Sequence, residues 1–61
     1  MILCKLMELE RKSQRMTFRV LKEKTGICFG RLVDIEKGRA IPTKYEKQDI
    51  CKALGIYHQD H

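Results

Sequence analysis

The 61-residue sequence contains no CxxC pair, no segment in which polar and apolar residues alternate, and no long hydrophobic run. The three cysteines, Cys4, Cys28 and Cys51, are far apart, and an odd number cannot close into a complete set of disulfides. This usage favours reduced thiols, with Cys28 and Cys51 as small core residues, in a cytoplasmic protein. Without period-two alternation, the sequence favours an all-α fold.

The sequence also lacks the side-chain sets that enzymes and membrane spans need. The apolar opening MILCKLM is interrupted by Lys5 and followed by Glu8, so it is too short for a signal-peptide core or a spanning helix. No Ser/His/Asp set, paired-carboxylate site or phosphate loop occurs, so we expect neither an enzyme nor a small-molecule substrate. His58 and His61 have a spacing that can bind metal, but we expect this terminus to fray, and we predict no metal or cofactor.

Positive charge is in excess, with a net charge of +5 and a pI near 9.4. Six Lys and Arg residues oppose only Glu23 between positions 11 and 24, and four oppose only Glu46 between positions 37 and 47. A basic surface predicts anionic partners, nucleic acid before anionic lipid, so we expect double-stranded DNA rather than a membrane. A chain this short buries only ~60% of the surface that it exposes when unfolded, which leaves little room for an enclosed active site.

Helical spacing predicts a compact bundle of four short helices, with a fifth left open, near residues 3–13, 18–24, 29–37 and 44–54. Thr17 can cap the second helix, and Thr43 with Glu46 forms a capping box for the fourth. Gly26, Gly38 and Gly55 mark helix ends, because glycine readily adopts the left-handed conformation of a helix exit.

The same spacing assigns faces to the helices. Val20 and Leu21 are expected to turn inward from the second helix, and Cys28, Leu32 and Ile35 from the third. The outer side of the third helix then carries Phe29, Gly30, Val33, Asp34 and Lys37. For Asp34, two interpretations stay open: acceptance from a cytosine amino group, or a solvated carboxylate paired with Arg31 or Lys37.

The residues that punctuate positions 17–42 are Thr17, Leu21, the run Glu23-Lys24-Thr25-Gly26-Ile27, Leu32, the run Ile35-Glu36-Lys37-Gly38, and Pro42. This pattern, with KALG at 52–55, resembles the Xre/Cro-repressor helix-turn-helix family over about 50 residues. In that family the second helix of the motif enters the major groove and the first crosses the backbone. The resemblance implies that residues 1–61 form a single helix-turn-helix DNA-binding domain of a repressor-like transcriptional regulator.

Carried over position by position, the resemblance implies base contacts from Phe29, Gly30, Val33 and Asp34. It implies backbone contacts from Phe18, Arg19, Lys37, Arg39 and Lys44, and a structural ion pair between Arg11 and Glu36. Family members usually bind as symmetric dimers with half-sites ~34 Å apart. They often dimerise through a fifth helix, for which few residues follow Gly55, so a homodimer and a monomer both stay open.

The chain departs from the family at Phe18, where glutamine is usual, and at Cys28, where a serine or threonine cap is usual. The first change removes a phosphate contact, and the second removes a side-chain acceptor at the helix start, at a cost of ~1 kcal/mol. Phe18, Phe29 and Val33 together support an alternative function, in which the same fold is a protein-interaction module of the antitoxin or adaptor kind.

Overall fold

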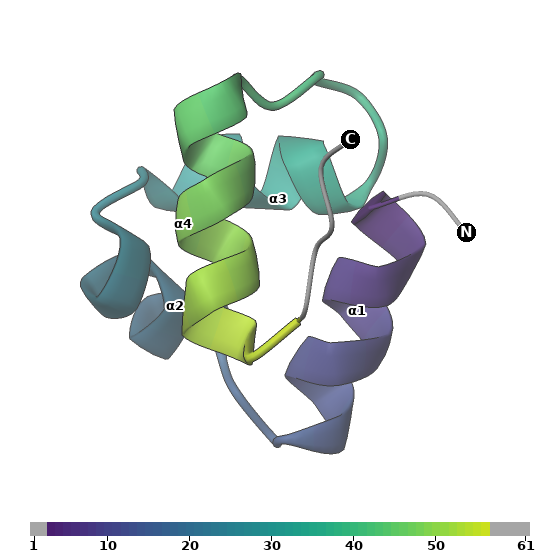
Figure 1. Ribbon diagram of the computed structural model, residues 1–61, viewed down its shortest axis with the longest axis vertical. Helices are drawn as coiled ribbons and strands as arrows, with labels where there is room; N and C mark the ends of the chain where they lie inside the picture. The colour runs from purple at the N-terminus through teal and green to yellow at the C-terminus, as the bar shows by residue number, and fades with distance from the viewer. Residues whose placement is uncertain (1–2, 57–61) are drawn as a thin grey trace.

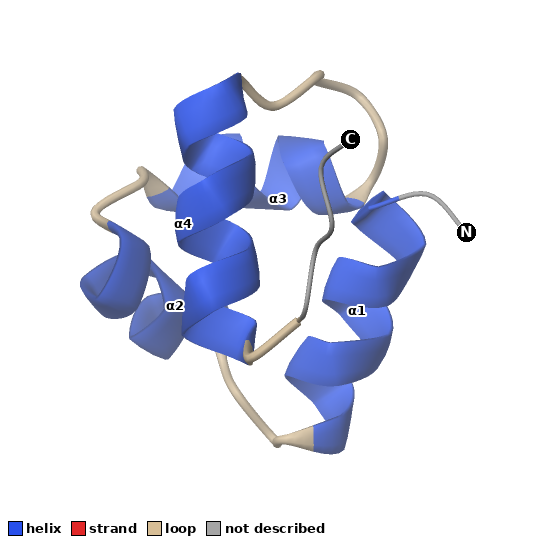
Figure 2. Ribbon diagram, viewed as in Figure 1, coloured by secondary structure: helices blue, strands red, loops and turns tan. Residues whose placement is uncertain are grey.

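The computed structural model describes residues 3–56, and these residues form four α-helices and no strand. In chain order they are α1 (Leu3–Ser13), α2 (Phe18–Thr25), α3 (Phe29–Glu36) and α4 (Lys44–Leu54), as Figures 1 and 2 show. The expected helix positions are confirmed, with α2 ending one residue later and α3 one residue earlier than expected. The fifth helix that the sequence left open, and the His58/His61 pair at which we predicted no metal, lie outside the described residues.

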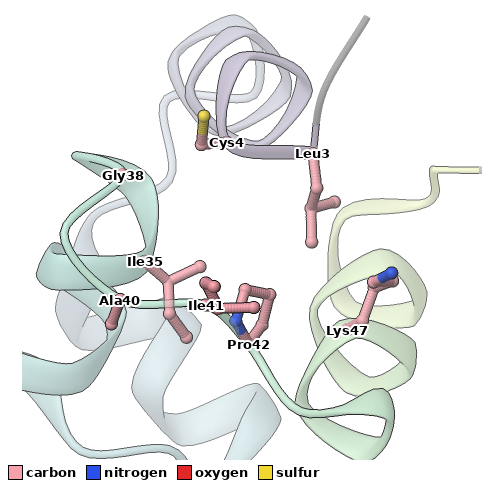
Figure 3. A pocket seen from close by; sticks show the side chains of 8 residues that line it. All are labelled: Leu3, Cys4, Ile35, Gly38, Ala40, Ile41, Pro42 and Lys47. Carbon is pink, nitrogen blue, oxygen red and sulfur yellow. The ribbon is translucent and has the colours of Figure 1, made fainter.

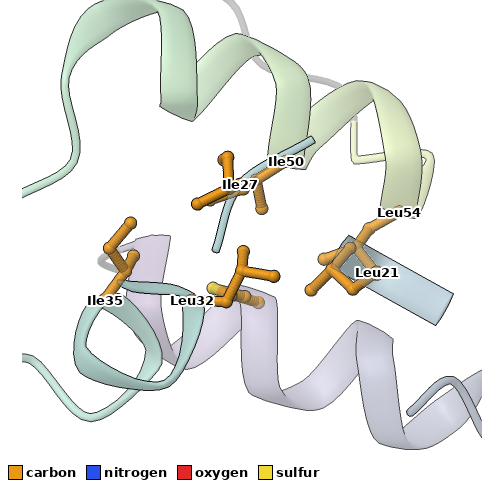
Figure 4. Close-up of a cluster of buried hydrophobic side chains, with 7 residues drawn as sticks. Leu21, Ile27, Leu32, Ile35, Ile50 and Leu54 are labelled. Carbon is orange, nitrogen blue, oxygen red and sulfur yellow. The ribbon is translucent and has the colours of Figure 1, made fainter. Parts of the chain in front are cut away.

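One apolar core holds the helices together. It consists of the buried side chains Met7, Leu21, Ile27, Leu32, Ile35, Ile50 and Leu54, most of which Figure 4 labels. All four helices or their flanking residues supply part of it. α1 packs against α3 and α4, and α2 packs against α3 and α4. Full burial of one such side chain stabilises the fold by ~1.5–3 kcal/mol, so a short chain depends on every one of them.

The turn between α2 and α3 is built as its sequence indicates. The Thr17 hydroxyl accepts a hydrogen bond from the backbone N–H of Val20 at the start of α2. Gly26 ends α2 with φ of 75°, and its N–H donates to the carbonyl of Lys22 at 2.7 Å. Ile27 then enters the core directly after the turn. This tight reversal places α3 against α1 and α2 and leaves its opposite side uncovered by them.

The segment between α3 and α4 is a loop with polar anchors at both ends. The backbone N–H groups of Arg39 and Ala40 donate to the carbonyl of Asp34, which closes the last turn of α3. At the start of α4 the capping box is complete, because Thr43 and Glu46 each accept the other's backbone N–H. Two backbone donors at this helix start, the N–H groups of Thr43 and Glu46, are therefore satisfied by the capping box.

Two residues do not face the core as the helical spacing predicted. Cys28 is exposed: it is the residue before α3, with non-helical φ of −56° and ψ of 146°, so the helical phase does not extend to it. Ile27 takes the core position instead. Val20 is 38% exposed. The short α2 buries only one of its sides, and Leu21 is its fully buried residue. Cys51 is buried, as expected, and burial raises the pKa of its thiol.

Candidate nucleic-acid interface

The outer side of α3 carries the residues that the sequence assigned to base contacts. Phe29 is 54% exposed, Gly30 is exposed, and Val33 and Asp34 are half-buried. A Cβ built on Gly30 would meet nothing within 4 Å, so the backbone here is open to approach. Leu32 and Ile35 anchor the helix from its inner side. The first turn of α3 therefore presents an apolar, accessible surface to any partner.

Phe29 is not a free side chain, because its ring lies against that of Phe18. The two ring centroids are 5.7 Å apart and the planes meet at 71°, which is an edge-to-face pair. The guanidinium carbon of Arg11 lies 4.2 Å from the centroid of the Phe18 ring, within cation–π range. A continuous chain of contacts thus runs from α1, through the first residue of α2, to the first residue of α3.

Arg11 and Glu36 form the expected ion pair. Nε and Nη2 of Arg11 donate to the two carboxylate oxygens of Glu36 at 2.8 and 3.0 Å, while Nη1 donates to the carbonyl of Met16 at 3.0 Å. Only 4% of the Glu36 side chain and 14% of the Arg11 side chain are exposed. The hydrogen bonds with Glu36 raise the pKa of the Arg11 guanidinium. This pair fixes the end of α3 to the end of α1.

A second bidentate pair, between Arg31 and Glu46, was missed at the sequence level. Nε and Nη2 of Arg31 donate to the Glu46 carboxylate at 3.0 and 2.9 Å, and Nη2 also donates to the carbonyl of Ile41 at 3.1 Å. These bonds, with that from the Thr43 N–H, lower the pKa of Glu46 to about 2. Glu46 was assigned to the capping box alone, and no spacing rule signals a partner fifteen residues away across a loop.

Asp34 pairs with neither of the partners expected for it. Its Oδ1 lies 3.4 Å from Nη1 of Arg39, in the loop that follows α3, while Arg31 is held by Glu46. The loop brings Arg39 back beside Asp34 because its N–H donates to the Asp34 carbonyl. Both side chains are largely exposed, so the pair is weak and its Arg39 has donors to spare.

The other cations assigned to the DNA backbone are accessible. Arg19, Lys37 and Lys44 are exposed, and within residues 3–56 none of them forms an ion pair. They come from α2, from the end of α3 and from the start of α4. Their side chains face solvent, so all three cations are accessible to an anionic partner.

The structure also contains an apolar hollow of about 350 Å³, seen in Figure 3. It lies between the start of α1, the loop after α3 and α4, and its lining is formed by Leu3, Cys4, Ile35, Gly38, Ala40, Ile41, Pro42 and Lys47. None of the residues predicted to contact DNA lines it. Among the described residues that line the hollow, Lys47 and Cys4 are the ones with ionisable side chains.

No group of three or more His, Cys, Asp or Glu side chains gathers in a metal-binding arrangement within residues 3–56. None of the four helices is long and apolar enough to cross a membrane. Comparison with protein-family models, with curated proteins and with solved structures finds no match to this chain.

Proposed function

We propose that this chain binds double-stranded DNA as a transcriptional regulator, with α3 inserted in the major groove. The observation that supports this most directly is the state of α3: its inner side is anchored in the core, while Phe29 and Gly30 are accessible, and the exposed cations Arg19 and Lys37 lie on α2 and at the end of α3. The major groove admits an α-helix, and a helix that is anchored in the core can enter it without reorganising the fold.

The cations supply the affinity in this proposal. Arg19, Lys37, Lys44 and Arg39 neutralise phosphates from the two ends of α3, which orients the helix without reading sequence. Phe18 has no polar side-chain atom, so it serves the backbone only through its N–H at the first position of α2. The net charge of +5 steers the chain towards DNA and favours rapid association.

The test is a titration of a fluorescent mixed-sequence duplex at 50 and 200 mM salt. Release of counterions from three to four phosphates weakens binding by roughly 40- to 150-fold between these concentrations. Lys44→Ala should reduce the salt slope by about one, whereas Lys52→Ala should leave it unchanged. These two lysines are matched, because both are exposed and they lie in the first and last turns of α4. Binding with no salt dependence would overturn the proposal.

A second candidate function is favoured by the exposure of the aromatic pair. Phe29 is 54% exposed and stands with Phe18 and the half-buried Val33, which makes an apolar patch of the kind that binds another protein. In that case α3 would dock on a protein partner as an adaptor or antitoxin does. A shallow salt slope, with no preference among duplexes, would favour this function. Sedimentation with and without DNA separates a homodimer from a monomer in either case.

A further inference from the structure

We infer that α3 selects C5-methyl groups of pyrimidines in the major groove, and that Phe18 and Arg11 are positioning residues for the reading side chain, Phe29. This inference rests on the proposed function and specifies what the inserted helix recognises. It starts from what α3 cannot do. Phe29, Gly30 and Val33 have no side-chain donor or acceptor, so they cannot form the paired hydrogen bonds that identify adenine or guanine.

The one arginine of α3 is also withheld from the bases. Arginine is the side chain that most often reads guanine, but the Arg31 guanidinium is bound by both oxygens of Glu46 and by the carbonyl of Ile41. On the base edges in the major groove, the methyl group at C5 is the apolar feature. Thymine carries this methyl, and 5-methylcytosine presents the same group. The apolar part of the reading surface, formed by Phe29 and Val33, therefore matches the C5-methyl group of a methylated pyrimidine.

The orientation of Phe29 is fixed by the contacts behind it. Its ring packs edge-to-face against the Phe18 ring, with the two centroids 5.7 Å apart. The Phe18 ring in turn contacts Arg11, whose guanidinium carbon lies 4.2 Å from the Phe18 centroid. Arg11 is itself immobilised by two hydrogen bonds to Glu36 and one to the carbonyl of Met16. A rigid aromatic side chain loses little conformational entropy on binding, so its contact with a methyl group is retained as selectivity.

Gly30 completes the site. It follows Phe29 on the outer side, and a side chain there would extend into open space, where the edge of a base pair would lie. Its absence lets the α3 backbone approach closely enough for Phe29 to reach a C5 methyl group. The site therefore consists of one aromatic reader, one gap beside it, and a fixed chain of supports.

The experiment compares duplexes that differ only in these methyl groups. One arm uses alternating A·T DNA and its deoxyuridine counterpart, and the other uses a G·C duplex with cytosine or 5-methylcytosine. Fluorescence anisotropy at one salt concentration gives the affinity ratio in each arm. We expect about fourfold tighter binding for each methyl group that the protein buries. The arm in which the preference appears identifies thymine or 5-methylcytosine as the source of the methyl group.

Three variants separate reading from positioning. Phe29→Ala should bring the ratio to about one. Phe18→Leu keeps apolar packing against the core but removes the ring, and should lower the ratio while Phe29 remains. Lys44→Ala is the control, since it should weaken binding to both duplexes equally and leave the ratio unchanged. Far-UV circular dichroism checks that each variant is folded. Methyl selection itself is tested by the affinity ratio of the unaltered protein, so this test does not depend on a variant that folds.

The outcomes are distinguishable. Failure to bind any duplex overturns the proposed function, and with it this inference. Salt-dependent binding with a ratio of one in both arms overturns methyl selection but leaves DNA binding in place. A ratio that survives Phe29→Ala shows that another residue reads the methyl group, and a ratio unchanged in Phe18→Leu overturns the positioning role.

Discussion

Removal of Arg11 alone should lower the free energy of unfolding strongly, whereas removal of Arg11 and Glu36 together should lower it much less. The Arg11→Met variant keeps an unbranched side chain of similar reach but deletes three hydrogen bonds, two to Glu36 and one to the Met16 carbonyl. The Glu36 side chain is 4% exposed, so its charge stays out of water when its partner is removed. In the double variant, Glu36→Leu replaces that stranded charge with an apolar side chain.

The structure sets the size of these effects. Deletion of one partner of a buried pair costs about 3–5 kcal/mol, because the other charge is left uncompensated, whereas replacement of both by apolar side chains is often close to neutral. A domain of 61 residues has a free energy of unfolding of about 3–9 kcal/mol. The single variant therefore loses between about one third and all of the total stability. We expect the double variant to recover most of this loss, except for the Met16 carbonyl bond.

Urea unfolding at pH 7, followed by far-UV circular dichroism, measures the three free energies with one probe. The control is Lys12→Met, which also replaces a cation by methionine, one residue further along α1, where Lys12 forms an exposed pair with Glu8 at 3.3 Å. This change should cost less than ~0.5 kcal/mol. A cost below ~1 kcal/mol for Arg11→Met, or a double variant less stable than the single one, would falsify the argument.

Three further outcomes are expected from other contacts. The pKa of Glu46 lies at about 2, below its ordinary value of 4.5, so its ion pair with Arg31 stabilises the fold above about pH 4.5, and this stabilisation is lost as the pH falls towards 2. The difference in unfolding free energy between the unaltered protein and Glu46→Gln, measured with urea, should therefore shrink across this pH range. A difference that stays constant would refute this prediction. Arg39→Ala should weaken binding to all duplexes about equally and lower the salt slope by about one, and a loss confined to one sequence would mean that Arg39 reads a base. Gly26→Ala should cost ~1–2 kcal/mol, because Gly26 has a left-handed φ of 75°, although a Cβ there would meet no other atom. Gly30→Ala should instead stabilise α3 by ~0.5–1 kcal/mol and weaken DNA binding. If both variants changed the thermal stability in the same direction, the conformational argument would be contradicted.

The helices and their ends could be predicted from the sequence because their signals are local. Thr17 and the Thr43/Glu46 box lie within three residues of the N–H groups that they cap. Gly26 ends α2 through a conformation that one residue decides. The Arg11–Glu36 pair is not local, since 25 residues separate its members, and it was found only through the family resemblance. The structure confirms the pair, although no family match supports the resemblance itself.

Contacts that depend on the path of a loop between two helices could not be predicted from the sequence. The Arg31–Glu46 and Asp34–Arg39 pairs both involve the segment between α3 and α4, whose path no periodicity describes. Arg15 adopts a left-handed φ of 54° in the turn after α1, where glycine or asparagine would be the usual signal. The proposed base and phosphate contacts are in a different position, because they need a DNA molecule to test them and stay predictions.

The three ionisable residues of α3 all form ion pairs with residues outside the helix. These ion pairs become more exposed to solvent from Glu36 to Arg31 to Asp34. The side chains of Glu36, Arg31 and Asp34 are 4%, 37% and 47% exposed. Only Asp34 is held by a single exposed contact, to Arg39 at 3.4 Å, whose loss costs ~1 kcal/mol or less. In the proposed complex, a phosphate that draws Arg39 away therefore frees the Asp34 carboxylate. Of the three ionisable residues of α3, Asp34 is therefore the one whose side chain a partner can engage with the least loss of internal contacts.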